Sequence, residues 1–151
     1  MSVKMPPIEK IHEAYSAIAD GRIVMRETEA DVTSSDGAKQ YLVKWNEGVY
    51  SSNDNASYWK GYLGYPLIAV LMLQKKLSLD SEIADYFKGI NWKALNTKHK
   101  NKFAEAVQEI MDGFAASGID CDIINKEIKK VYQEIEHLTI STKRSALRPP
   151  R

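Results

Sequence analysis

Residues 50–66 contain the side chains most suited to binding a ring-shaped ligand. Tyrosines and a tryptophan alternate there with asparagines, an aspartate and a lysine. Aromatic faces stack on a sugar ring or a nucleobase, while amides and carboxylates hydrogen bond to its polar edge. The candidate ligand-binding residues are Tyr50, Asn53, Asp54, Asn55, Tyr58, Trp59 and Tyr62. The alternative interpretation is a capped loop that leads into a helix, with its aromatic residues partly buried.

Unpaired hydroxyl and amide groups are costly to bury, so part of this segment should face solvent. We expect Asn53, Asp54 and Asn55 at an exposed loop tip. The larger side chains would then line a shallow recess beside them: Tyr58, Trp59 and Tyr62.

Two groups of basic residues offer a different chemistry. Three lysines follow Thr97, the expected cap of a long helix, where a bound anion would offset their unfavourable interaction with the helix dipole. Residues 139–151 also contain basic side chains and no acid. This pattern predicts weak nucleic-acid binding as an alternative function, although a solvated helix start also explains the lysines. The residues of this alternative are Lys98, Lys100, Lys102, Lys143 and Arg144.

The histidines and the cysteine do not form a metal-binding or nucleophile motif. His12 is spaced from Glu9 and Glu13 as helical ligands would be, but a solvated helix face explains the same spacing. Cys121 is at a predicted helix start, and its two flanking aspartates disfavour a thiolate. We therefore expect no metal and no cofactor, and the catalytic residues of any enzyme activity stay unknown.

The element that must position the candidate site is the apolar run Leu67–Leu73. It has no polar side to face water and is far shorter than the ~20 residues needed to cross a bilayer. Pro66 suits a first helical turn, and the composition of the run favours a helix over a strand. Lys75 and Lys76 would fall in the last turn. We predict a buried core helix within residues 61–77.

The rest of the chain shows helical and strand periodicities in a clear order. Before the core helix, we predict a helix over residues 7–19 and strands over 22–32, 39–45 and 49–51, with a turn at 34–37. After it, we predict a short helix near 80–87, one turn from Asn91, a long helix from Thr97, and a last helix from Asp120 or Asp122.

This order predicts an α+β fold. It consists of an N-terminal helix, a small antiparallel β-meander, a buried central helix and a C-terminal antiparallel helix pair. We expect a single domain over residues 1–140, followed by a disordered basic tail over 141–151.

The composition is compatible with several classes of function. The chain has 151 residues, one cysteine and no leader sequence, from which we expect a cytoplasmic protein. Our first hypothesis is a small cytosolic binding or adaptor domain that acts through the aromatic and Asn/Asp-rich loop. The alternatives are a small enzyme on a sugar or nucleotide-like substrate, with Asp54 as its base, or weak nucleic-acid binding. The expected partner is an unknown small molecule or protein, and not a membrane.

Overall fold

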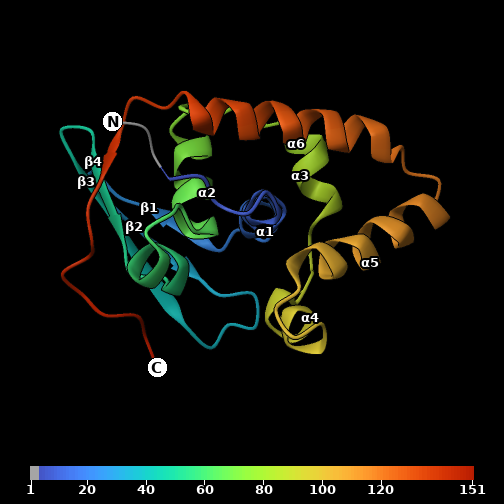
Figure 1. Ribbon diagram of the computed structural model, residues 1–151, viewed down its shortest axis with the longest axis horizontal. Coiled ribbons are helices and arrows are strands. Elements are labelled where there is room, and N and C mark those ends of the chain that lie inside the picture. The colour runs from blue at the N-terminus through green and yellow to red at the C-terminus, as the bar shows by residue number, and fades with distance from the viewer. Residues whose placement is uncertain (1–3) are drawn as a thin grey trace.

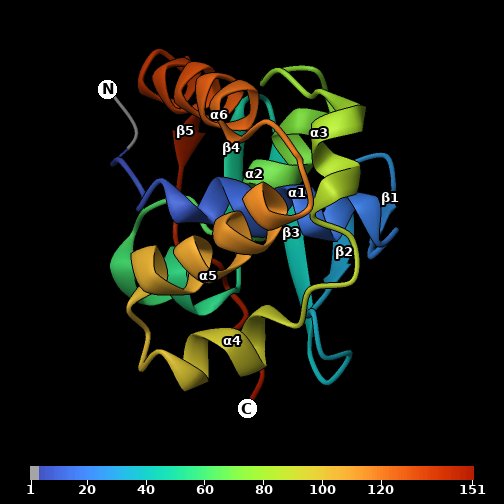
Figure 2. The same ribbon diagram turned by 90° about the vertical axis from the view of Figure 1, so that its right-hand side faces the viewer.

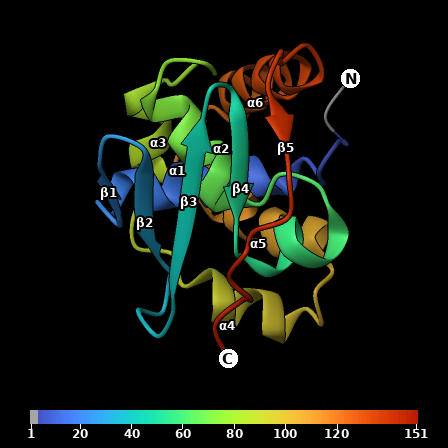
Figure 3. The same ribbon diagram turned by 90° about the vertical axis from the view of Figure 1, so that its left-hand side faces the viewer.

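One face of the molecule is a twisted sheet of five strands in the order β1-β2-β3-β4-β5, in a computed structural model that describes residues 4–151 (Figure 3). Strands β1 to β4 pair antiparallel in sequence order, and β5 adds to β4 in parallel. The strands are β1 (Ile23–Met25), β2 (Glu29–Thr33), β3 (Gln40–Asn46), β4 (Val49–Ser52) and β5 (Ser141–Thr142).

The helices cover the other face of the sheet in two further layers (Figures 1 and 2). Helices α1 and α2 form the middle layer, and α3, α5 and α6 lie beyond them. Helices α5 and α6 run in opposite directions from their short connection and diverge along their length. The mixed α+β fold predicted from the sequence is therefore confirmed. The helices are α1 (Glu9–Ala19), the short π-helix η1 (Ala56–Lys60), α2 (Tyr65–Leu73), α3 (Ser81–Tyr86), α4 (Trp92–Lys98), α5 (Phe103–Ala116) and α6 (Cys121–Glu136).

Helix α2 is the core helix predicted from the apolar run. Its residues from Pro66 to Met72 are all buried, and it packs against strands β3 and β4. The two lysines lie after the helix and not in its last turn, because Lys75 adopts a left-handed φ of 63° that ends the helix. Of the helices within residues 4–151, none is long and apolar enough to cross a membrane.

Helix α1 is buried on all sides, which the sequence pattern did not predict. Seven consecutive residues from Ile11 to Ala17 are buried, because α2 packs on one side and α3, α5 and α6 pack on the others. The predicted solvated face is therefore wrong: His12 is 4% exposed and Glu13 is 6% exposed.

The predicted strand over residues 22–32 is a hairpin. Strand β1 turns back on β2 at residues 26–28, so that Ile23 pairs with Val32 and Met25 with Ala30. Arg26 stabilises this turn by pairing with Glu29 and Asp31. As a result Val24 is exposed on the edge strand of the sheet.

The predicted long helix from Thr97 begins later, at Phe103. Thr97 lies inside α4, where its hydroxyl donates to the carbonyl oxygen of Lys93 over 2.8 Å. Lys100 and Asn101 have positive φ values of 54° and 62°, so the chain reverses direction between α4 and α5. Lys98 is consequently at a helix C-terminus, where a cation interacts favourably with the dipole.

The first residues after Ile140 form a short strand, whereas the sequence predicts disorder over residues 141–151. The backbone N–H of Ser141 donates to the Gly48 carbonyl and that of Lys143 to the Tyr50 carbonyl, both over 2.9 Å. These bonds form β5 and bring the basic tail beside the segment that follows β4 (Figure 3).

Candidate functional site

A cavity of about 580 Å³, which we call the main cavity, lies between α1, α4, the β2–β3 hairpin and the η1 segment. A more open depression of about 720 Å³ lies at the end of α6. Polar side chains from several separate parts of the chain converge on the main cavity, and aromatic side chains line much of the rest. The polar residues include Lys10, Glu13, Arg22, Tyr41, Tyr65 and Asn96. The aromatic ones include Trp59, Tyr62, Trp92 and Phe103.

Glu13 is the buried carboxyl group of this cavity. One of its oxygens lies 3.3 Å from the Lys10 ammonium, and the other accepts a hydrogen bond of 3.3 Å from the Asn96 amide. Lys10 is held in turn over the ring of Phe103, 4.0 Å from the ring centre. Burial raises the pKa of Glu13 above its usual range, although Lys10 opposes this effect. A buried carboxyl group with a raised pKa is suited to proton exchange with a ligand.

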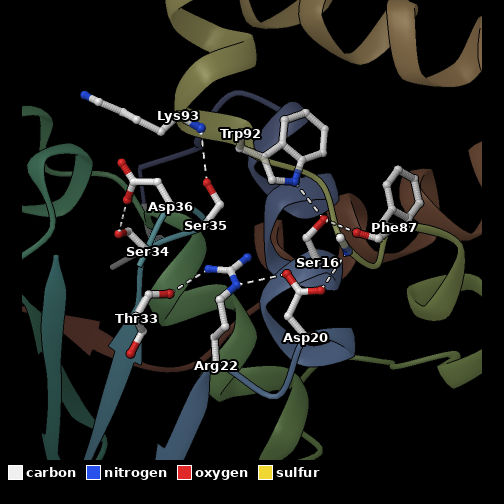
Figure 4. Close-up of polar contacts among 11 residues, drawn as sticks. Ser16, Asp20, Arg22, Thr33, Ser34, Ser35, Asp36, Phe87, Trp92 and Lys93 are labelled. Atoms are coloured by element: carbon white, nitrogen blue, oxygen red, sulfur yellow. Dashed lines mark hydrogen bonds and ion pairs between the residues drawn. The ribbon is translucent and has the colours of Figure 1, made fainter. Parts of the chain in front are cut away.

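Arg22 is fixed at the side of the cavity by an ion pair and a backbone contact (Figure 4). Its Nε donates to Asp20 over 3.1 Å, and its Nη1 donates to the Thr33 carbonyl over 2.6 Å. Asp20 also accepts from the backbone N–H of Gly89, which ties the end of α1 to the chain after α3. The remaining nitrogen, Nη2, is buried and has no hydrogen-bond partner within residues 4–151.

A second set of contacts in Figure 4 holds α4 as the opposite wall. The Ser16 hydroxyl donates to the Phe87 carbonyl over 2.6 Å and accepts from the Trp92 indole over 2.7 Å. The backbone N–H of Lys93 donates to the Ser35 hydroxyl in the hairpin turn, over 3.1 Å. These bonds connect α4 to both α1 and the hairpin, so the elements that bound the cavity are linked to one another.

Tyr41 and Tyr65 come together at the sheet side of the cavity, with their rings edge to face and 6.3 Å apart. Burial raises the pKa of both hydroxyls. Both groups therefore stay neutral at physiological pH and can donate or accept hydrogen bonds.

The sequence predicts Asn53 at an exposed loop tip, and this prediction is wrong. Asn53 is buried, because its side chain completes the hydrogen bonding of two backbone segments. Its Oδ1 accepts from the backbone N–H of Leu42 over 2.7 Å, and its Nδ2 donates to the Arg148 carbonyl over 3.2 Å.

Asp54 is also buried, and it acts as the cap of η1. Its carboxylate accepts from the Ser52 hydroxyl and from the backbone N–H of Ser57. These contacts give Asp54 a structural role in place of the exposed position expected from the sequence. Of the three residues predicted for the tip, Asn55 alone is exposed.

Gly64 allows the close approach of the Asp54 carboxylate. A Cβ atom built on Gly64 would overlap the carboxylate, whereas its φ of −77° is available to any residue. We therefore expect Gly64→Ala to displace Asp54 and to lower the free energy of unfolding by about 1 to 3 kcal/mol. Urea denaturation measures this change.

Gly113→Ala is the matched control for this prediction. Gly113 lies within α5, and a Cβ atom there would meet nothing within 4 Å. This control should raise the free energy of unfolding by about 0.5 to 1 kcal/mol, since alanine favours a helix over glycine. A Gly64→Ala variant as stable as the wild type would show that the carboxylate does not need this space.

The aromatic candidates divide between two cavities. Tyr50 is buried in the core, and its hydroxyl donates to Gln74 over 2.6 Å. Trp59 and Tyr62 line the main cavity together with Asp54 and Asn55. A second, smaller cavity is lined by Tyr50, Tyr58, Trp59 and Tyr62.

Residues 3–141 match the family model described as "Uncharacterised conserved protein UCP014422". The chain belongs to this family. Comparisons with curated proteins and with solved structures gave no match. The matched part of the UCP014422 chain includes every residue that lines the main cavity.

The basic residues of the nucleic-acid alternative belong to two different parts of this UCP014422 chain. Lys98 pairs with Glu109 over 2.7 Å, and Lys102 lies 3.9 Å from Glu105. Lys143 and Arg144 follow β5 and lie beside the η1 segment.

Sequence reasoning missed the residues that define the main cavity, above all Glu13, Arg22 and Asn96. The one sequence signal for a buried Glu13 is the presence of Ala14, Ser16 and Ala17 around it, since small side chains allow close packing of helices. Within residues 4–151, no group of three or more His, Cys, Asp or Glu side chains is placed to hold a metal ion.

Proposed function

We propose that this chain is a binding domain for a small polar molecule, and that the molecule occupies the main cavity beneath η1. The observation that carries the proposal is the convergence of two ionisable groups on one cavity of about 580 Å³. Glu13 is buried, and Arg22 is partly buried with an Nη2 that has no hydrogen-bond partner in the described chain. Cavities of this size are typical of small-molecule sites, in which a few polar groups fix the orientation of the ligand.

The lining favours a ligand with several hydroxyl or amide groups and one flat face. Glu13, Asn96 and the two tyrosine hydroxyls offer both donors and acceptors, and Arg22 carries a donor with no partner in the described chain. Trp59 adds an aromatic face, and it is 58% exposed. A sugar or a nucleoside combines these features. A cytoplasmic location is part of this proposal, because the single Cys121 allows no internal disulfide.

The raised pKa of Glu13 favours a second candidate, a small enzyme that acts on the same class of ligand. Glu13 would serve as the general acid or base in this case. It replaces Asp54 in that role, because one carboxylate oxygen of Asp54 accepts from the Ser52 hydroxyl and the other from the Ser57 N–H in η1. Product formation from a bound ligand, and its loss in Glu13→Gln, would distinguish an enzyme from a binding domain.

The test is an NMR screen of the full chain with ribose, glucose, adenosine and uridine. A ligand of the main cavity should shift the backbone amides of residues 10–13 and of Asn96. Glu13→Gln should weaken its binding about tenfold or more, because a charge-assisted hydrogen bond contributes roughly 1.5 to 3 kcal/mol.

Glu105→Gln is the matched control, since Glu105 is exposed on α5 and does not line the cavity. It should leave the affinity unchanged. Shifts confined to amides outside the cavity, or equal affinity in the wild type and Glu13→Gln, would contradict the proposed site.

A further inference from the structure

The second cavity, of about 360 Å³, lies between η1 and the segment that follows β5. We call it the tail groove, defined by Tyr58, Trp59, Lys60, Tyr62, Lys143 and Arg144. The parallel pairing of Val49 with Ser141 and of Tyr50 with Thr142 brings these two distant segments together (Figure 3). The aromatic cluster and the basic tail, which are far apart in the sequence, thus form one surface.

The tail groove carries positive charge, and no acidic side chain lines it within residues 4–151. Three cations line it, Lys60, Lys143 and Arg144. None of these cations belongs to an ion pair within residues 4–151. A concave surface with uncompensated positive charge attracts anions, and phosphate in particular.

The same groove presents exposed aromatic surface. Trp59 is 58% exposed, and its ring contacts that of Tyr58 edge to face with the centres 4.6 Å apart. The Arg144 guanidinium lies 5.0 Å from the Tyr58 ring centre. Cations next to an exposed aromatic ring are the features that bind a base and its phosphate in single-stranded nucleic-acid sites.

Ser57 adds a hydrogen-bond donor to the groove. Its Oγ accepts from the backbone N–H of Gly64 over 3.1 Å, and its own proton has no acceptor within residues 4–151. This proton is available to a phosphate or sugar oxygen.

We propose that the tail groove binds a nucleoside phosphate, with the base stacked on Trp59 and the phosphate held by Lys143 and Arg144. The ligand is either a free nucleotide or one unit of a single strand, because both present the same base and phosphate. This site is separate from the Glu13 cavity, and the two share only the wall formed by Trp59, Lys60 and Tyr62.

The experiment titrates the full chain with AMP, adenosine, inorganic phosphate and an oligoadenylate hexamer, followed by amide shifts at 50 mM and 200 mM salt. AMP should bind about tenfold or more tightly than adenosine or phosphate alone, because it makes both contacts. The shifted amides should be those of residues 57–62 and 142–144. Equal affinity for AMP and the hexamer identifies a free nucleotide as the ligand. Tighter binding of the hexamer, with a steeper loss at high salt, identifies a single strand.

Two variants separate the phosphate and base contacts. The double variant Lys143→Gln/Arg144→Gln should weaken AMP binding about tenfold or more. The control is Lys126→Gln/Lys129→Gln, which makes the same change in charge at exposed positions of α6 and should leave AMP binding unchanged. Trp59→Ala should lower the affinity for AMP to that for inorganic phosphate. Both changes are on exposed side chains, and an unchanged melting temperature verifies the fold.

The inference is overturned if AMP shifts no amide of the tail groove, or if the Lys143→Gln/Arg144→Gln variant binds AMP as the wild type does. Glu13→Gln should leave AMP binding unchanged. Weakening of AMP by Glu13→Gln alone would place the nucleotide in the main cavity, which would support the proposed function and reject the tail groove.

Discussion

Leu71→Ala is expected to lower the free energy of unfolding by about 2 to 5 kcal/mol. Leu71 is 0% exposed and lies in α2, between the sheet and α1. Truncating it removes buried apolar surface and leaves a cavity that the surrounding helices and strands cannot fill. Urea denaturation followed by far-UV circular dichroism measures the change.

Leu73→Ala in the same helix is the matched control. Leu73 is 36% exposed, so the same truncation should cost less than about 1 kcal/mol. Equal losses of the free energy of unfolding in the two variants would contradict the position of α2 in the core. They would mean that the positions of Leu71 and Leu73 are equally buried.

Acidification from pH 7 to pH 4 is expected to destabilise the fold through His12. Burial against Phe87 lowers the pKa of His12 to about 4, although the carbonyl oxygens of Ile8 and Glu9 oppose this effect. Between pH 6.5 and 4, the unfolded chain binds a proton that the folded chain does not bind, so stability falls as the pH falls. The full effect of the difference between 6.5 and about 4 is about 3 kcal/mol.

Glu13 should act in the opposite direction over part of the same range. Its raised pKa means that the folded chain binds a proton more readily than the unfolded chain, so stability rises as the pH falls through the folded pKa toward 4.5. His12→Gln should therefore flatten the loss of stability in acid, and Glu13→Gln should steepen it.

Urea denaturation at a series of pH values tests both signs, and an NMR titration of the His12 imidazole tests the cause directly. Titration of His12 near pH 6.5, or an unchanged pH profile in His12→Gln, would contradict its burial as a neutral side chain.

The sequence by itself determined the features that depend on neighbouring residues. The apolar run Leu67–Leu73 predicts a buried helix, because every side of such a helix is apolar and none of them favours contact with water. Asn91 and Asp120 predict helix starts, because their side chains reach backbone N–H groups two or three residues ahead. The turn at residues 34–37 predicts the β2–β3 hairpin for the same local reason.

Predictions from neighbouring residues were wrong where the same residues fit two different secondary structures. Thr97 is as suitable for a helix interior as for a cap, and its hydroxyl bonds to the preceding turn of α4. Residues 22–32 have the composition of one strand, but a hairpin lets Arg26 pair with both Glu29 and Asp31.

The tertiary structure decided which polar residues became functional candidates. Glu13 has the sequence context of an exposed helical residue, and it is buried only because α1 is enclosed by four other helices. Asn53 resembles a loop-tip residue, yet its side chain bonds to the Leu42 N–H and the Arg148 carbonyl, which only the folded chain brings near it.

The tail groove depends in the same way on the pairing of β5 with β4, which joins residues about ninety positions apart. Helix and cap signals are local and can be derived from spacing, whereas burial and cavities arise from contacts between distant segments, which spacing does not encode.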